Sequence, residues 1–192
     1  MTSANEIREV KVWDIAVRAG HWALVVFFAI AYLSGEIELE TLHAWAGYAI
    51  LGIVLFRIIW GFVGTPHARF ADFVFGLKQT GAYARSLLTR EPKHYLGHNP
   101  LGRIAVAGLL LVMIVQALTG LLLAGTDIYF PPFGSWIAQW IAAAGVDPAT
   151  LVPYSPEMYD KDSYADMRSL REPIALVHLY SFYVFAIGIV IH

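Results

Sequence analysis

The sequence contains no cysteine, and this absence excludes several kinds of redox site. A chain without thiols forms no disulfide, holds no thiolate-bound iron–sulfur cluster and attaches no haem through a Cys-x-x-Cys-His motif. Charge is scarce too, because only 15% of the 192 residues are charged, whereas an average soluble domain carries about 25%. Any redox cofactor must be held by other side chains, and the seven histidines are the obvious supply.

Hydrophobic residues make up 58% of the chain, and they gather in four long runs. A helix needs about 20 mostly apolar residues to cross a bilayer. Only helices and closed barrels satisfy their backbone in lipid, and these runs are too long for barrel strands. The sequence therefore predicts an all-α membrane protein with one domain, 1–192, and a bundle of four transmembrane helices near 15–34, 42–63, 103–124 and 174–192.

Basic residues are distributed unevenly along the chain. Ten of the thirteen fall in the N-terminal segment, in the loop between the second and third spans, or in the adjoining ends of spans. Cytoplasmic loops carry an excess of lysine and arginine. We therefore expect both termini and that loop to face the cytoplasm. No small-residue cleavage site follows the first apolar run, so we expect the first span to stay in the mature protein.

The outward loops are acidic, with ten carboxylates against three basic residues. Such a surface favours a partner with a basic patch, or it is merely a solvated face. In the long loop 125–173, apolar residues recur at helical spacing: Trp136, Ile137, Trp140 and Ile141. This spacing predicts a short amphipathic helix that either lies at the outer membrane interface or caps the bundle.

Four histidines lie within or at the ends of the spans: His21, His43, His178 and His192. Ionisable residues inside a membrane are costly and usually functional. His178 and His192 are 14 residues apart, which is nearly four turns and about 21 Å along one helix, so they share a face. Span directions place His43 and His178 at outer depth, and His21 and His192 at inner depth. Two imidazoles at one depth, on different helices, can bind both axial positions of one haem iron.

Each of these histidines alone could instead be a core residue hydrogen-bonded to a carbonyl or a serine, and it is the set of four that favours haem. The other three histidines, His67, His94 and His98, fall in the cytoplasmic loop. We interpret them as solvated or hydrogen-bonded loop residues rather than metal ligands. A haem-free transporter with a histidine proton relay is a further alternative, and an absorption spectrum distinguishes it.

Glycines occur at positions where a flat macrocycle would need room. Gly47 and Gly188 each lie one turn from a predicted ligand, and Gly35 lies on the face of His21 at the depth of the outer pair. The alternative for each glycine is ordinary helix packing, because small residues also mediate helix contacts in lipid.

Arg57 follows His43 by 14 residues, so it lies on the same face at the depth of the inner pair. A buried arginine needs an anionic partner, and no acidic residue falls within the four predicted spans. We expect Arg57 to bind a haem propionate, or alternatively to extend toward the inner headgroups.

Short motifs accompany the histidines. They are Val12-Trp13-Asp14, Arg18-Ala19-Gly20-His21-Trp22, His43-Ala44-Trp45-Ala46-Gly47, Gly97-His98-Asn99-Pro100-Leu101-Gly102 and the His178/His192 pair. This combination resembles the bacterial cytochrome b561 family, which includes b-type cytochrome subunits of membrane-bound hydrogenases and formate dehydrogenases. The resemblance covers essentially the whole chain.

The resemblance implies two non-covalent haems b in a multi-pass protein of the bacterial inner membrane, with electron exchange between an outer partner and quinone. It also implies a quinone site near the inner haem, for which Asn99 and Gly102 are candidates. We expect a periplasmic partner such as a c-type cytochrome or a dehydrogenase or hydrogenase subunit, and no nucleic acid. The alternative is a stand-alone quinone oxidoreductase, superoxide- or quinol-linked. Family members continue the last helix, so we expect the native chain to extend past His192.

Overall fold

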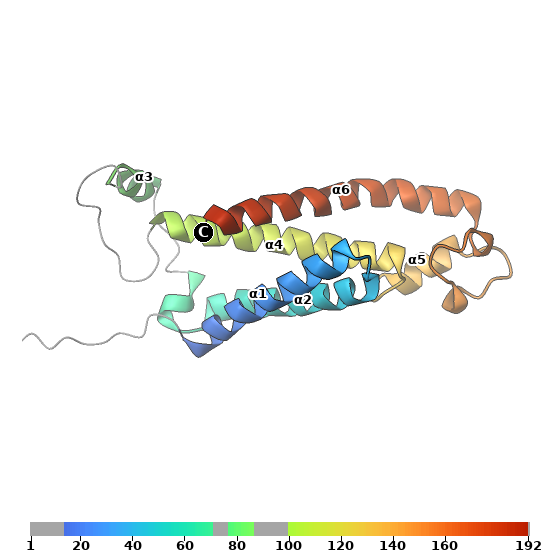
Figure 1. Cartoon of the computed structure of the whole chain (residues 1–192), viewed down its shortest axis with the longest axis horizontal. Coiled ribbons are helices and arrows are strands. Elements are labelled where there is room, and N and C mark those ends of the chain that lie inside the picture. The colour runs from blue at the N-terminus through green and yellow to red at the C-terminus, as the bar shows by residue number, and fades with distance from the viewer. Residues whose placement is uncertain (1–13, 71–76, 87–99, 192) are drawn as a thin grey trace, which may run out of the picture.

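The computed structural model describes residues 14–70, 77–86 and 100–191 (Figure 1). Its regular secondary structure in these ranges is helical, apart from an isolated bridge between Ala142 and Tyr159. The α-helices are α1 (Ile15–Glu36), α2 (Glu40–Val63), α3 (Leu77–Ser86), α4 (Pro100–Asp127), α5 (Gly134–Ile141) and α6 (Lys161–Ile191). Short 3-10 turns lie at Pro66–Ala68, Pro148–Thr150 and Pro156–Met158.

Four of these helices, α1, α2, α4 and α6, are long and apolar enough to cross a membrane. The prediction of four long apolar helices is therefore confirmed. The last helix is longer than the predicted span, because it begins at Lys161 rather than near Ile174 and contains Pro173. Its polar first turns extend beyond the apolar run, and Asp160 accepts a hydrogen bond from the Ser163 amide at 3.0 Å in its first turn.

The spanning helices form two antiparallel pairs, α1 with α2 and α4 with α6, and α2 packs on α4 between the pairs (Figure 1). Aromatic rings join α1 to α6, where Phe28 lies 6.1 Å from Phe182 and 5.2 Å from Phe185 between ring centres. The start of α1 and the end of α6 lie at the same end of the bundle. This is the end that the distribution of basic residues predicts to face the cytoplasm.

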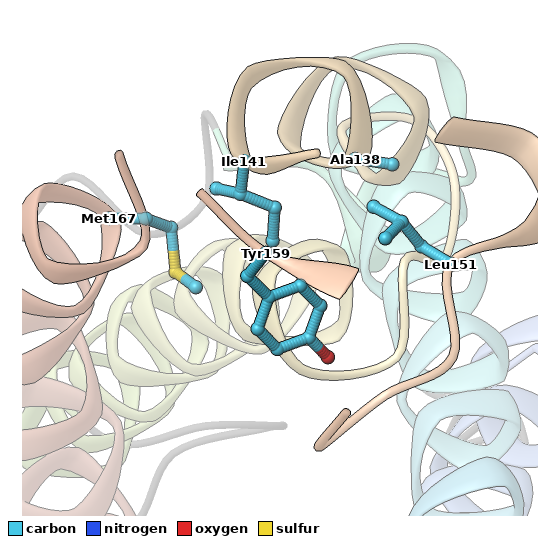
Figure 2. Close-up of a cluster of buried hydrophobic side chains, with 5 residues drawn as sticks. All are labelled: Ala138, Ile141, Leu151, Tyr159 and Met167. Atoms are coloured by element: carbon cyan, nitrogen blue, oxygen red, sulfur yellow. The ribbon is translucent and has the colours of Figure 1, made fainter. Parts of the chain in front are cut away.

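Residues 128–160, here called the cap, fold over the other end of the bundle. Side chains of the cap and of α6 form a small apolar core, shown in Figure 2: Ala138, Ile141, Leu151, Tyr159 and Met167. The Tyr159 hydroxyl donates to the Val152 carbonyl at 2.7 Å, and the Tyr48 hydroxyl of α2 donates to the Pro131 carbonyl. The cap is therefore a packed unit that is bonded to the bundle.

The short helix that the spacing of aromatic residues predicts is α5. Ala138 and Ile141 on one face are buried in the cap core, whereas Trp136 and Trp140 on the other face are 67% and 41% exposed. One face of α5 thus packs in the cap core, and the other face is exposed. That the exposed face of α5 lies at the membrane surface stays a prediction.

Asp14 stabilises the start of α1 and braces it against the end of α2. One carboxylate oxygen accepts from the Val17 amide at 2.7 Å, and the other accepts from Trp60 Nε1 at 3.0 Å and from Thr65 Oγ1 at 2.7 Å. Burial raises the pKa of Asp14, but the hydrogen bonds from Val17, Thr65 and Trp60 outweigh it and hold the pKa below its usual value.

We expect Asp14→Ala to lower the free energy of unfolding by about 1–2 kcal/mol, because it removes a helix cap and the acceptor of two further hydrogen bonds. Asp14→Asn should cost less than Asp14→Ala but more than nothing, since its one oxygen can still cap the helix while its NH2 group cannot accept from Trp60. A carboxylate with a lowered pKa stabilises the fold above its ordinary pKa and loses this effect as pH falls through the folded value. Detergent unfolding against pH measures both effects.

The control is Asp147→Ala, which removes the cap of a three-residue 3-10 turn where Asp147 accepts from the Ala149 amide. Its cost should be smaller, because no second element depends on that carboxylate. An equal loss in the two alanine variants would contradict the bracing role of Asp14.

Candidate metal centre

The structure brings His43 of α2 and His178 of α6 together. Their ring centres lie 6.3 Å apart, with the ring planes at 70° to each other. A metal bound between two imidazoles requires roughly this spacing, since each metal–nitrogen bond is about 2 Å and each nitrogen lies about 1 Å from its ring centre. These two histidines are the predicted outer pair, and the geometry agrees with their equal depth.

One nitrogen of His43 is already engaged. His43 Nδ1 lies 2.8 Å from the carbonyl oxygen of Ala31 on α1. A carbonyl only accepts hydrogen bonds, so Nδ1 carries the proton and Nε2 keeps its lone pair. This tautomer leaves Nε2 available to a metal, with the orientation of the ring fixed by α1.

His178 is held by α4. Its Nε2 lies 3.0 Å from Gln116 Nε2, and its Nδ1 lies 2.9 Å from Thr119 Oγ1. The Gln116 side chain is oriented in turn by Ser181, whose hydroxyl donates to Gln116 Oε1. The imidazole therefore has a fixed position even though it lies in an apolar span.

A cavity of about 200 Å³ adjoins both imidazoles. Besides the two histidines, its walls include residues from the ends of α1 and α4 and from the turn before α2: Ser34, Gly35, Glu38, Gly120, Leu123 and Asp127. Asp127 is paired with Arg171 of α6, whose Nε lies 2.5 Å from Asp127 Oδ1. The site is thus apolar in its depth and charged at one edge.

Two glycines make room for the imidazoles. A Cβ on Gly35 would lie 3.1 Å from His43 Nδ1, and one on Gly120 would lie 3.1 Å from His178 Cε1. Both distances are shorter than an ordinary contact. The sequence predicts that Gly35 makes room for a macrocycle, and the structure places it against the imidazole ring of His43.

The other two predicted glycines differ from Gly35. No atom lies within 4 Å of a Cβ built on Gly47, so that position faces open space. A Cβ on Gly188 would lie 2.6 Å from Leu109 Cδ2 of α4. Gly188 therefore permits close approach of α4 and α6, which is the helix-packing alternative for this residue.

The predicted inner site is described only in part. His21 is exposed on α1, with its ring edge-on to Trp22 at 5.9 Å. Gly102 lies in the first turn of α4. His192 and Asn99 lie outside the described residues, so the structure does not place His21 relative to its predicted partner.

Arg57 has neighbours that the sequence argument did not include. Its guanidinium carbon lies 5.1 Å from the centre of the Phe70 ring, and the carboxylate of Asp14 attracts its charge. The N-cap of α1 therefore brings a carboxylate to the same end of the bundle as Arg57, although no acidic residue lies within the predicted spans. Binding of a propionate stays a prediction.

The sequence of the chain matches that of known membrane cytochromes. A match to the family described as prokaryotic cytochrome b561 extends over residues 12–192. The chain belongs to the prokaryotic cytochrome b561 family. Membership implies haem b and electron transfer within a membrane, which agrees with four spanning helices and a pair of facing imidazoles.

Relatives within this family are described as probable Ni/Fe-hydrogenase B-type cytochrome subunits. The one from Rhizobium leguminosarum bv. viciae is 29% identical over 167 residues, covering 70% of this chain and 69% of that protein. The one from Bradyrhizobium diazoefficiens is 30% identical over 166 residues, covering 68% and 66%. The chain thus spans about two thirds of the length of these relatives. No solved structure matches it.

Sequence reasoning missed the contribution of α4 to this b561 site. Gln116, Thr119 and Gly120 all contact the His178 ring or lie against it. A signal was present, because Gln116 and Thr119 are polar residues three positions apart in an apolar span, and such residues face the bundle interior. The third span contains no histidine. The sequence therefore did not indicate which face of this span lies against His43 and His178.

We expect Gly35→Ala and Gly120→Ala to weaken any binding of haem between His43 and His178, because each new methyl group would press on one of these two rings. The controls are Gly52→Ala and Gly108→Ala, where no atom lies within 4 Å of the added Cβ. An alanine in a helix interior normally stabilises by about 0.5–1 kcal/mol relative to glycine. Haem-to-protein ratio and thermal stability measure the two effects, and haem loss in all four variants would contradict the steric argument.

Proposed function

We propose that this protein carries electrons across the bacterial cytoplasmic membrane between a periplasmic redox partner and the quinone pool. Two haems b would be held by histidine pairs, His43 with His178 near the periplasm and His21 with His192 near the cytoplasm. The proposal rests mainly on the distance of 6.3 Å between the ring centres of His43 and His178, which belong to different long apolar helices.

The residues around the cavity fit a haem. The imidazoles of His43 and His178 would hold the haem iron, and the porphyrin would supply its remaining nitrogen ligands. A bound haem b provides a one-electron redox couple, and the protein determines its position and surroundings. His43 fits this role directly, because its protonated Nδ1 is bonded to Ala31 and its Nε2 is left for the metal.

The inner site is supported by helix register rather than by observed contacts. If the helical register of α6 continued past Ile191, His192 would follow His178 by about four turns, a rise of about 21 Å, on the same face. His21 is at the same end of the bundle, near the start of α1. Arg57 of α2 also belongs to this end, where its positive charge would favour the ionised propionates of a haem. Asn99 and Gly102 are the candidates for the adjacent quinone site.

The proposed partner docks on the cap. The names of the relatives associate them with Ni/Fe hydrogenase, so a periplasmic hydrogenase or dehydrogenase subunit is one class of partner, and a c-type cytochrome is another. The cap and the first turns of α6 carry exposed carboxylates, among them Glu157, Asp162 and Asp166. Such a surface attracts a basic docking patch and raises the rate of association.

The two haem sites should fail independently when their ligands are removed. We expect His43→Ala and His178→Ala to remove one spectral component and to leave the other in place. His21→Ala and His192→Ala should do the reverse, because a helical rise of about 21 Å over the 14 residues from His178 to His192 would be too far for one iron to bridge. Haem stoichiometry and a two-component redox titration of each variant measure this. If His43→Ala and His21→Ala remove the same component, the pairing by depth is wrong.

Electron transfer from a basic c-type cytochrome should slow severalfold as ionic strength rises from about 10 mM to 300 mM, since salt screens exposed charges. Replacing the three carboxylates together, Glu157→Gln, Asp162→Asn and Asp166→Asn, should lower the rate at low salt and flatten the dependence. Stopped-flow reduction in nanodiscs measures this. A neutral quinol analogue as reductant is the control, and a rate that does not respond to salt would remove the electrostatic part of the proposal.

A further inference from the structure

Both ring nitrogens of His178 have partners on α4, and the two partners differ in chemistry. Gln116 Nε2 is an amide nitrogen that only donates, so His178 Nε2 must accept from it. Thr119 Oγ1 is a hydroxyl oxygen that can donate or accept, and it lies 2.9 Å from His178 Nδ1. What Thr119 does toward the ring therefore depends on where its own proton goes.

The hydroxyl proton of Thr119 is directed at the helix backbone. Thr119 Oγ1 lies 2.8 Å from the Val115 carbonyl and 3.1 Å from the Gln116 carbonyl, both within α4. A hydroxyl has a single proton, and a carbonyl can only accept. Thr119 thus donates its proton within its own helix and turns a lone pair toward His178. His178 carries its proton on Nδ1 and donates it to Thr119.

We propose that Thr119 is a positioning residue for the outer haem: it accepts the Nδ1–H bond of His178, presents Nε2 to the iron and increases the electron donation of the imidazole. This inference rests on the proposed function, because it takes His178 as an axial ligand. Iron would take the Nε2 lone pair that accepts from Gln116 in this structure. Gly120 supports the arrangement, since it leaves the His178 ring room against α4.

His43 and His178 are each held by a hydrogen bond from Nδ1, but the two acceptors differ. His43 donates its Nδ1 proton to a backbone carbonyl, that of Ala31. His178 donates to a side chain, which a single substitution can remove. When the ring nitrogen that does not bind the metal donates a hydrogen bond, the ligating imidazole becomes more basic. A more basic ligand stabilises ferric over ferrous iron. Loss of the Thr119 hydroxyl should therefore raise the reduction potential of the outer haem.

The test uses the full chain with both haems bound, in nanodiscs. Thr119→Val has nearly the shape of threonine but lacks the hydroxyl, and Thr119→Ser restores it. In Thr119→Val we expect the ferric-to-ferrous ratio of the outer haem, at a fixed potential, to fall by up to about tenfold. Tenfold is an upward shift of about 59 mV for a one-electron couple. Thr119→Ser should return the potential to its original value. Potentiometric titration and the ferric electron paramagnetic resonance signal are the readouts.

Two controls separate this role from a general disturbance of α4. Thr126→Val removes a hydroxyl that also donates to its own helix, at 3.0 Å to the Leu123 carbonyl, but does not touch a histidine. Gln116→Leu removes the contact on the other nitrogen of His178. If Nε2 is the ligand, iron would replace Gln116 as the partner of that nitrogen, so the shift in potential in Gln116→Leu should be smaller than that in Thr119→Val. A large shift in Gln116→Leu and none in Thr119→Val would mean that Nδ1 is the ligand, and the inference would be wrong.

The outer component is the one that His43→Ala removes. A shift in that component alone, reversed by serine, supports the inference. Loss of the outer haem in Thr119→Val with retention in Thr119→Ser supports it too, whereas loss in both variants overturns it. An unshifted potential in Thr119→Val, or an equal shift in both components, also overturns it. If His43→Ala removes no spectral component at all, the proposed function fails, which is a separate result.

Discussion

The rest of the structure depends on one constraint, which is that an imidazole in an apolar span must have a partner for its proton. His43 on α2 satisfies it with the Ala31 carbonyl on α1, and His178 on α6 satisfies it with Thr119 on α4. The pair of rings therefore brings all four spanning helices to one place. A buried polar network of this kind specifies a single packing, because each unpaired member would carry the full cost of desolvation.

The cap extends this site beyond the spans. Asp127, at the end of α4, is a wall of the cavity and is paired with Arg171 of α6. At the start of α2, the Glu40 carboxylate accepts from the Tyr154 hydroxyl of the cap at 2.5 Å. The cap is thus attached at the same end of the bundle where His43 and His178 meet. Its apolar core keeps it folded, and its bonds to α2 fix it over the cavity.

The sequence could predict the features that depend on periodicity and spacing along one helix. Four spans, and the equal depth of His43 and His178, come from apolar length and a rise of about 1.5 Å per residue. Contacts between helices could not be predicted in this way. The rotation of α4, which brings Thr119 to His178, depends on packing against two neighbours. The carboxylate of Asp14 lies outside every apolar run, yet the fold brings it to the end of α2 near Arg57.

The hydrogen-bond partners of His43 and His178 differ in how a substitution can alter them. The Ala31 carbonyl belongs to the backbone, so substitutions at that position leave the bond to His43 available whatever the side chain. The anchor of His178 consists of side chains, and hydrogen bonding around a ligand is one means by which proteins adjust a haem potential. If these histidines bind haem iron as proposed, His43 would fix the geometry of the site and His178 would carry the adjustable bond. Adjustment of the potential of that haem would then be concentrated on α4, the spanning helix that contributes no predicted iron ligand of its own.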